Sequence, residues 1–306
     1  MSAITNNFRV LNLGAGVQST TLYIKFAVGQ LDAPCPQVAI FADTQDEPHW
    51  VYEHIDWLEA TYGHRIPILR TTKGKLSEHL KTGQNSSGQR FASIPAFTKS
   101  KDGSVGRTRR QCSKEYKVVP IEQAIRYMVV GLAPRRPLPR DVSVTQYIGM
   151  SFEEQGRAWK LRRRFATKPR WFCEFPLIDI EWTRRKCLSF LSGIVPHRVR
   201  RSACRECPYH SNTEWLELQS DPVEWPQVVA IDDGLRVPGA VVNRKLNQRL
   251  FLHRSCVPLR EIDFSALVEK ERNEQEERRR IKGLQGQLPT MEFNHFSEEC
   301  EGVCGV

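Results

Sequence analysis

Short apolar runs alternate with stretches of helical periodicity along the first half of the chain. Buried strands are predicted at Phe8–Leu13, Val38–Ala42, Ile66–Leu69 and Val142–Gly149. Helices are predicted at Ser19–Leu31, Pro48–Tyr62, Pro120–Leu132 and Thr183–Leu191. Strands that alternate with helices indicate an α/β fold, in which a parallel sheet is connected by crossover helices.

The segment from Thr82 to Gln111 interrupts this pattern. It is rich in Gly, Ser and basic residues and shows no periodicity. A stretch of this kind inside a domain is usually functional or disordered. Arg107, Arg109 and Arg110 lie near its end, so two interpretations stay open: a mobile loop that closes over an anionic ligand, and a solvated insertion.

The character of the chain changes again after Ser202, where Cys and Trp become frequent and periodicity weakens. The charged run Glu269–Lys282 predicts a solvated or protruding helix. We therefore expect an α/β domain over residues 1–200. Residues 201–306 would form a Cys-rich, mainly helical C-terminal region with a flexible, Cys-containing tail.

The composition is that of a globular protein with a basic surface. The chain has 306 residues, of which 40% are hydrophobic, and 45 Lys and Arg against 35 Asp and Glu give a net charge of +10. Positive charge attracts nucleotides, nucleic acids and sulfated substrates without choosing among them. The start lacks the features of a secretion signal, and no apolar run reaches the roughly 18 residues of a membrane span. We expect a cytoplasmic protein without membrane contact.

The turn Gly14–Ser19, directly after the first predicted strand, has the character of a phosphate-binding turn. Its small residues let the backbone approach an anion, and the following helix directs its free N–H groups to the same point. The turn lacks the glycine spacing of a dinucleotide fingerprint and the Lys-Ser/Thr ending of a Walker loop. By itself, the pattern fits an ordinary strand-to-helix turn as well as a phosphate site.

Several segments resemble, in order, the phosphoadenylyl-sulfate (PAPS) reductase-like branch of the PP-loop, or adenine nucleotide α-hydrolase-like, superfamily. In FRVLNLGAGVQSTTL, Gly16 and Ser19 match the superfamily's phosphate loop, whereas Gly14, Ala15 and Gln18 depart from its usual Ser-Gly-Gly-x-Asp-Ser form. The later segments are IFADTQDEPHWVYEHIDWL, RRQCSKEYKVVPIEQAI, YIGMSFEEQGR and FPLIDIEWTRRKCLSFL. The resemblance implies a doubly wound, mostly parallel sheet with helices on both faces.

The same resemblance implies an adenine-nucleotide site. The residues that would hold the phosphates are Gly14, Ala15, Gly16, Val17, Gln18 and Ser19. Asp43 would lie near the adenosine or a metal ion such as Mg²⁺, and Arg157 would approach the phosphate or sulfate end. The residues alone also allow Asp43 to be a cap or turn aspartate, and Arg157 to pair with Glu153 on a helix surface.

Cys204 and Cys207 form a Cys-x-x-Cys pair, which can bind a metal ion from one tight turn. A four-iron four-sulfur (4Fe-4S) cluster, a structural zinc ion and a redox pair are all compatible with this spacing. Two groups of iron–sulfur enzymes in the branch, the adenylyl-sulfate reductases and the DNA phosphorothioation sulfurtransferases, carry cysteines at positions that Cys112, Cys204 and Cys207 match. We take Cys256 as the fourth ligand and prefer the cluster to zinc.

The C-terminal tail carries Cys300 and Cys304. A cysteine on a flexible terminus can swing into a site and attack, and PAPS reductases use a C-terminal Glu-Cys-Gly segment in this way. Alternatively, the acidic neighbours of these thiols raise their pKa and make them poor nucleophiles. The remaining cysteines are expected to be small buried hydrophobic residues, namely Cys35, Cys173 and Cys187.

These expectations describe an enzyme that binds an adenine nucleotide and reduces or transfers sulfur, with cysteine or iron–sulfur participation. In one route Cys300 or Cys304 attacks a sulfonucleotide, and a thiol electron donor completes the reduction. In the other, ATP adenylates an acceptor such as a nucleic acid, which then receives sulfur. A third hypothesis is a zinc-stabilised nucleic-acid-binding protein without catalysis.

Overall fold

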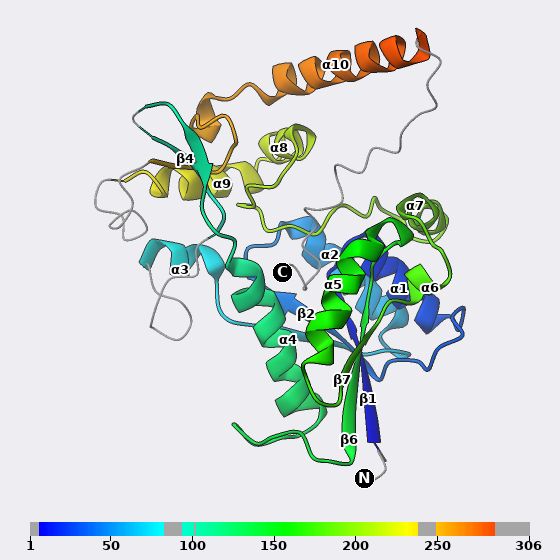
Figure 1. Cartoon of the computed structure of the whole chain (residues 1–306). Helices are drawn as coiled ribbons and strands as arrows, with labels where there is room; N and C mark the ends of the chain where they lie inside the picture. Colours follow the sequence, from blue (N-terminus) through cyan, green and yellow to red (C-terminus); the bar gives the residue numbers. More distant parts are fainter. Residues whose placement is uncertain (1–5, 83–93, 101, 238–248, 285–306) are drawn as a thin grey trace. The chain divides into compact units, whose positions relative to one another are not determined.

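The computed structural model describes residues 6–82, 94–100, 102–237 and 249–284, which fall into two compact units (Figure 1). The first unit contains the described residues of Met1–Leu76 and Cys112–Ser202, and the second contains those of Ser77–Gln111 and Ala203–Glu298. The sequence assigned Thr82–Gln111 to the domain 1–200, whereas the structure groups this segment with the second unit.

The first unit is built on a five-stranded parallel sheet (Figure 1). Its strands are β1 (Asn6–Asn12), β2 (Val38–Asp43), β3 (Ile68–Thr72), β6 (Val142–Ile148) and β7 (Trp171–Glu174), in the order β3-β2-β1-β6-β7. Every neighbouring pair is parallel. The expected parallel α/β sheet is therefore confirmed.

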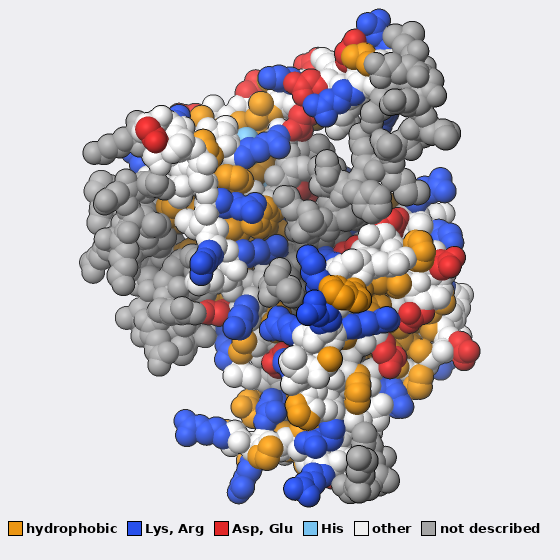
Figure 2. Space-filling view, in the orientation of Figure 1, with side chains coloured by type: hydrophobic (Ala, Val, Ile, Leu, Met, Phe, Trp, Pro, Cys, Tyr) orange, Lys and Arg blue, Asp and Glu red, His pale blue; other side chains and the backbone are white. Residues whose placement is uncertain are grey.

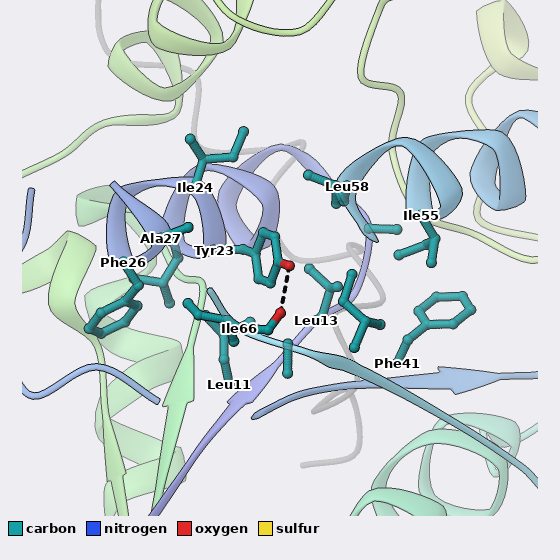
Figure 3. Close-up of a cluster of buried hydrophobic side chains, with 14 of the residues drawn as sticks. Leu11, Leu13, Tyr23, Ile24, Phe26, Ala27, Phe41, Ile55, Leu58 and Ile66 are labelled. Atoms are coloured by element: carbon teal, nitrogen blue, oxygen red, sulfur yellow. Dashed lines mark hydrogen bonds between the residues drawn. The ribbon is translucent and has the colours of Figure 1, made fainter. Parts of the chain in front are cut away.

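Helices cover both faces of this sheet. They are α1 (Val17–Ala27), α2 (His49–Tyr62), α4 (Val119–Ala124), α5 (Gln155–Ala166), α6 (Pro176–Asp179) and α7 (Arg184–Ser192). The neighbouring residues Val10 and Leu11 of β1 belong to different hydrophobic clusters, because successive side chains of a strand point to opposite faces. The cluster around Leu11 includes residues of α1 and α2 (Figure 3) and also of α7, and the cluster around Val10 includes residues of α4 and α5.

Local sequence explains where these helices lie. On one face, α1 is fully buried and its Tyr23 donates a hydrogen bond of 2.8 Å to the carbonyl oxygen of Ile66 (Figure 3). On the other, helical structure begins at Ser113, earlier than expected, and runs through α4 to Val129 with wide π-type turns at both ends. Pro120 lies inside this continuous segment, directly after the first π-type turn, and has no N–H to donate to the preceding helical turn.

The second unit combines a small sheet with helices. Its antiparallel strands are β4 (Phe97–Lys99), β5 (Val105–Arg107) and β8 (Arg249–Phe251), in the order β5-β4-β8. Its helices are α3 (Leu76–Thr82, which begins at the end of the first unit), α8 (Asn212–Gln219), α9 (Glu224–Gly234) and α10 (Phe264–Leu284). The fully buried rings of Trp215 and Phe264 stack 6.0 Å apart. The described part of Thr82–Gln111 thus holds the paired strands β4 and β5, which the sequence did not predict, and its role as a mobile loop over an anion or as a solvated insertion stays a prediction.

None of the helices in the described ranges is long and apolar enough to cross a bilayer.

Candidate nucleotide site

The strand order places the switch point of the sheet between β1 and β6, at their carboxyl ends. From β1 the chain winds outward through β2 and β3 on one side, and β6 and β7 extend the sheet on the other side. Open parallel sheets bind ligands at this kind of switch point, beyond the carboxyl ends of the strands. The turn after β1, which contains Gly14–Gly16, lies at this place, and so does Gly149 after β6.

The turn after β1 exposes the free N–H groups of a helix start. Ala15 adopts a positive φ of 60°, and the Gly16 N–H donates to Ser19 Oγ over 3.2 Å. Within the described residues, the N–H groups of Val17, Gln18 and Ser19 donate no hydrogen bond. No acidic residue lies in the first turn of α1, so the positive end of the helix dipole is not compensated there. This arrangement can receive an anion.

The Gln18 side chain is not directed toward a ligand of this turn. It is fully buried, its Oε1 accepts a hydrogen bond of 2.9 Å from Arg184, and its Nε2 donates one of 3.3 Å to Glu154. Gln18 therefore connects the turn to the first residue of α7 and to the residue before α5. The side chain of Gln18, a predicted phosphate-binding residue, therefore has a structural role, because it hydrogen-bonds to Glu154 and Arg184.

Glu154 joins the groups around Gln18. Its Oε2 accepts from the Ser151 N–H over 3.1 Å, its Oε1 accepts from Arg157 over 2.7 Å, and its side chain is only 2% exposed. The pairing of Arg157 is therefore with Glu154, one turn before it, and not with Glu153, which instead accepts from the Arg184 N–H. Two guanidinium groups, those of Arg157 and Arg184, are thus held at the edge of the turn.

Gly149 brings the end of β6 directly against the turn. A Cβ atom at this position would lie 2.6 Å from both N and Cα of Ser19 and 2.8 Å from the carbonyl carbon of Gln18. Ordinary carbon contacts are about 3.5–4.0 Å, so only glycine permits this approach. The end of β6 and the first turn of α1 are therefore in direct backbone contact.

Asp43, at the end of β2, is engaged as a turn aspartate. Its Oδ1 accepts hydrogen bonds from the Gln45 N–H over 2.7 Å and from the Tyr52 hydroxyl over 2.9 Å. Burial raises the pKa of Tyr52, and the neighbouring Asp43 carboxylate raises it further. A contact of Asp43 with adenosine or a metal ion stays a prediction.

A buried ion pair that the sequence did not single out follows β2. Glu47 is fully buried, its Oε1 lies 2.9 Å from the Nζ of Lys117, and it also accepts from the Thr44 hydroxyl over 3.3 Å. The Lys117 side chain is 5% exposed. Burying two charges costs desolvation free energy. An ion pair that is buried at the ligand-binding edge of a sheet is therefore a candidate functional group. Its only signal in the sequence was the resemblance around Lys117.

His54 of α2 contacts both Thr20 of α1 and His197, which lies after α7. The Thr20 hydroxyl lies 2.9 Å from His54 Nε2, and His54 Nδ1 lies 2.8 Å from His197 Nε2. The His54 ring stacks with the Trp57 ring at 6.2 Å. Burial, and to a smaller extent the neighbouring His197, lowers the pKa of His54 to about 4. His54 is therefore neutral near pH 7 and fixes the helix that begins at the anion-receiving turn.

The Cys-x-x-Cys pair lies in a tight turn of the second unit. The Cys207 N–H donates to the Cys204 carbonyl over 3.0 Å, and the Cys204 carbonyl also lies 3.0 Å from Nε2 of His210. Both thiols are partly buried, which suits two ligands from one turn. In the described residues no group of three or more His, Cys, Asp or Glu side chains is arranged as a metal site.

The other predicted metal ligands and nucleophiles are distributed between the units. Cys112 belongs to the first unit and directly precedes the helical segment that begins at Ser113. Cys256 is buried in the second unit, and burial raises the pKa of its thiol. Cys300 and Cys304 lie outside the described residues.

The remaining cysteines only partly follow the expectation of buried hydrophobic residues. Cys187 is buried, Cys173 is half-buried, and burial raises the pKa of Cys173 to about 11. The prediction is wrong for Cys35, which is exposed in the segment between α1 and β2. The seven cysteines in the described ranges form no disulfide with one another.

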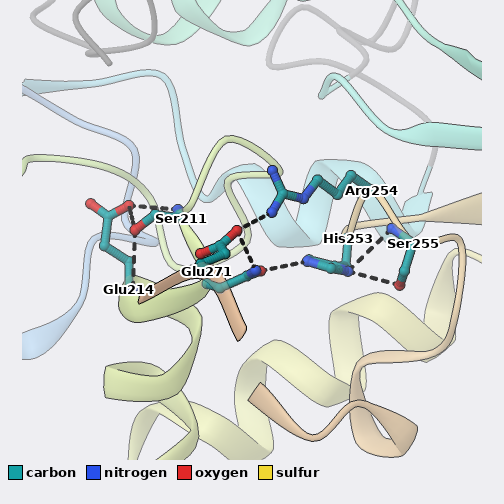
Figure 4. Close-up of polar contacts among 7 residues, drawn as sticks. Ser211, Glu214, His253, Arg254, Ser255 and Glu271 are labelled. Atoms are coloured by element: carbon teal, nitrogen blue, oxygen red, sulfur yellow. Dashed lines mark hydrogen bonds and ion pairs between the residues drawn. The ribbon is translucent and has the colours of Figure 1, made fainter. Parts of the chain in front are cut away.

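A polar network fixes the segment that carries Cys256 (Figure 4). The Asn212 amide nitrogen donates to Glu271 over 2.8 Å, so its oxygen accepts from His253 Nε2 over 2.9 Å. His253 Nδ1 is then an acceptor and receives the Ser255 hydroxyl over 2.8 Å. Burial lowers the pKa of His253 to about 4. The neutral imidazole therefore ties this segment to α8 and α10.

No protein-family model, curated protein or solved structure matches this chain.

Proposed function

We propose that this protein is a PAPS reductase-like enzyme of the PP-loop superfamily, which binds an adenine nucleotide at Gly14–Ser19 and reduces or transfers sulfur. The observation that carries the proposal is the helix start at the switch point of the sheet. The N–H groups of Val17, Gln18 and Ser19 donate no hydrogen bond within the described residues, and the guanidinium groups of Arg157 and Arg184 border the turn. Backbone N–H groups with nearby arginines are what phosphate and sulfate oxygens require.

The proposal assigns different tasks to the residues of the turn. Gly14, Ala15 and Gly16 allow the phosphates to approach, and the N–H groups of Val17, Gln18 and Ser19 bind them. The Gln18 side chain holds Arg184 in place, since its Oε1 lies 2.9 Å from that guanidinium. Gly149 keeps the turn rigid through its contact with Ser19.

The nucleotide is a sulfonucleotide in the first route. A cysteine thiolate attacks the sulfur, the bond between that sulfur and the phosphate oxygen breaks, and the adenosine phosphate leaves. A second thiol then attacks the cysteine sulfur, which releases sulfite and leaves a disulfide. Two thiols are oxidised and the sulfur is reduced by two electrons. Cys300 and Cys304 are the nucleophiles proposed from the sequence.

ATP is the nucleotide in the second route, which the basic surface of the chain supports. Cleavage between the α- and β-phosphates transfers adenylate to an oxygen of a nucleic-acid acceptor and releases pyrophosphate. A sulfur nucleophile then displaces the adenylate. The Cys204–Cys207 pair would serve this route as two ligands of an iron–sulfur cluster or zinc ion, with Cys112 and Cys256 proposed as the others.

Nucleotide binding tests the proposal directly. Calorimetric titration with adenylyl sulfate, PAPS and ATP is expected to give a dissociation constant well below 1 mM for at least one of them. Sulfite release in the presence of a thiol donor supports the first route, and pyrophosphate release from ATP supports the second. The proposal fails if none of the three nucleotides binds.

Arginine variants locate the site. Arg184→Gln removes a guanidinium from the edge of the turn, and loss of a charged hydrogen bond is expected to weaken nucleotide binding about tenfold or more. The matched control is Arg185→Gln, which removes the same charge from the exposed neighbouring residue. Equal weakening by both changes would show that the effect is one of overall charge and not of this turn.

A further inference from the structure

The helix α5 carries more basic side chains than any other described helix of the first unit. The helix reads QGRAWKLRRRFA, with five basic side chains and no acidic one. Figure 2 shows Lys and Arg side chains gathered over the part of the first unit where Figure 1 places α5. Trp159 is 58% exposed, a large fraction for a tryptophan, and the Arg163 guanidinium lies 4.8 Å from its ring centre.

The helix separates its apolar and basic sides. Its buried residues are Ala158, Leu161 and Phe165, which pack into the core. Trp159 and Arg163 lie four residues apart, and Lys160 lies between them, three residues before Arg163. Residues with these spacings share one side of a helix. The exposed indole and two cations therefore form one continuous outer surface.

The positive charge of this surface is not compensated nearby. Within the described chain, no carboxylate forms an ion pair with Lys160 or Arg163. Arg162 lies 3.7 Å from Asp179, but both side chains are more than half exposed, so this pair contributes little. Arg157, by contrast, is paired with Glu154 at the edge of the nucleotide site.

We propose that the outer face of α5 binds a single-stranded nucleic acid. A base stacks on Trp159, and backbone phosphates contact Lys160, Arg162 and Arg163. Exposed aromatic rings combined with cations are how proteins hold single strands, because every base has a face that can stack and every nucleotide carries a charge. A membrane surface would require an exposed apolar face, and the apolar face of α5 is buried in the core.

The helix also relates this surface to the nucleotide site. Arg157, in the first turn of α5, borders the turn of α1 through Glu154, and Trp159 follows two residues later. A strand held along α5 would therefore pass close to the bound nucleotide. That this strand is the acceptor of the proposed chemistry rests on the proposed function, whereas the binding itself does not.

Fluorescence anisotropy with labelled 20-nucleotide single strands of DNA and RNA, titrated at several salt concentrations, tests the inference. Trp159→Ala is expected to weaken binding roughly tenfold or more, the usual loss when one stacked base loses its platform. The triple variant Lys160→Gln/Arg162→Gln/Arg163→Gln is expected to lower the slope of log affinity against log salt by about two, at about 0.7 per phosphate contact.

Matched controls change the same residue types elsewhere. Tyr127→Ala removes an exposed aromatic ring outside α5, and Lys270→Gln/Arg278→Gln/Arg279→Gln removes three exposed charges from α10. Both controls should leave binding nearly unchanged. The inference is overturned if either control weakens binding as much as its partner variant. It is also overturned if Trp159→Ala has no effect, if duplexes or acidic peptides bind more tightly than single strands, or if no oligonucleotide binds.

Nucleotide titrations of the same α5 variants separate this inference from the proposed function. Oligonucleotide binding without binding of any adenine nucleotide would refute the proposed function alone. Nucleotide binding without oligonucleotide binding would refute the inference alone. Melting temperatures check that each variant is folded, which is expected because all the substituted side chains are exposed.

Discussion

Replacing Gly149 by alanine is expected to disturb the proposed nucleotide site through a single methyl group. The added carbon would lie 2.6 Å from the N and Cα atoms of Ser19, about 1 Å closer than carbon atoms normally approach. These neighbours are backbone atoms, so they cannot move aside by rotating a side chain. Overpacking of this kind costs about 1–3 kcal/mol of unfolding free energy.

The same shift should reach the ligand. To relieve the contact, the turn must move away from the end of β6, and the N–H groups of Gln18 and Ser19 move with it. We expect a lower urea midpoint and at least a tenfold loss of nucleotide affinity, measured by calorimetry on protein that is still folded. The loss of nucleotide affinity should be larger than in variants that are destabilised to the same extent by substitutions outside the first unit.

Gly156→Ala is the matched control for this change. A Cβ atom there would meet nothing within 4 Å, and Gly156 lies inside α5. Alanine favours the helix, so this variant should be more stable by about 0.4–1 kcal/mol and bind nucleotide normally. If Gly149→Ala unfolds at the wild-type urea midpoint and binds nucleotide as well as Gly156→Ala does, the contact between Gly149 and the turn is required neither for stability nor for nucleotide binding.

Three further changes test other parts of the molecule. Lys117→Met removes the cation 2.9 Å from the buried Glu47 carboxylate and should lower the unfolding free energy by about 3–5 kcal/mol in urea titrations. The double variant Glu47→Gln/Lys117→Met should recover most of this loss. Equal losses in the two variants would contradict the prediction. The pKa of His54 falls from 6.5 to about 4 on folding, so between these pH values the unfolded chain binds one proton more than the folded chain. The contribution of His54 to stability is therefore complete above pH 6.5 and declines as the pH falls to 4. The loss, about 3 kcal/mol, should be absent in His54→Gln, and parallel pH profiles for the two proteins would refute the assignment. Cys204→Ser should reduce the iron or zinc content found by elemental analysis of anaerobically purified protein, with Cys35→Ser as the control, and a wild-type protein free of both metals would exclude the metal proposal.

Part of the parallel sheet could be predicted because β1, β2 and β3 each contain or adjoin a short apolar run, whereas β7 (Trp171–Glu174) was not predicted. Val38–Asp43, for example, is buried along most of its length, and such runs are typical of strands covered on both faces. The turn at Gly14–Ser19 could be located for the same reason, since it ends the first of these runs. Periodicity in the sequence reports local environment, and these elements are defined locally.

The rest of the structure depends on contacts that local patterns do not record. β4 contains only Phe97–Lys99, and it is a strand because it pairs with β5 on one side and β8 on the other. The role of the Gln18 side chain likewise depends on Glu154 and Arg184, which are far away in the sequence. Nothing in the residues around Gln18 distinguishes a ligand-binding amide from one that holds two charged neighbours.

The second unit is built from two separate parts of the chain, and this has a consequence for biosynthesis. The ribosome delivers β4 and β5 before β6, whereas β8, the second neighbour of β4, emerges only after the whole sheet of the first unit. One edge of β4 therefore stays unpaired while the strands of the first unit are being synthesised. A fragment that stops at residue 200 would keep this edge open permanently. Such fragments are expected to aggregate, because an unpaired strand edge recruits other chains.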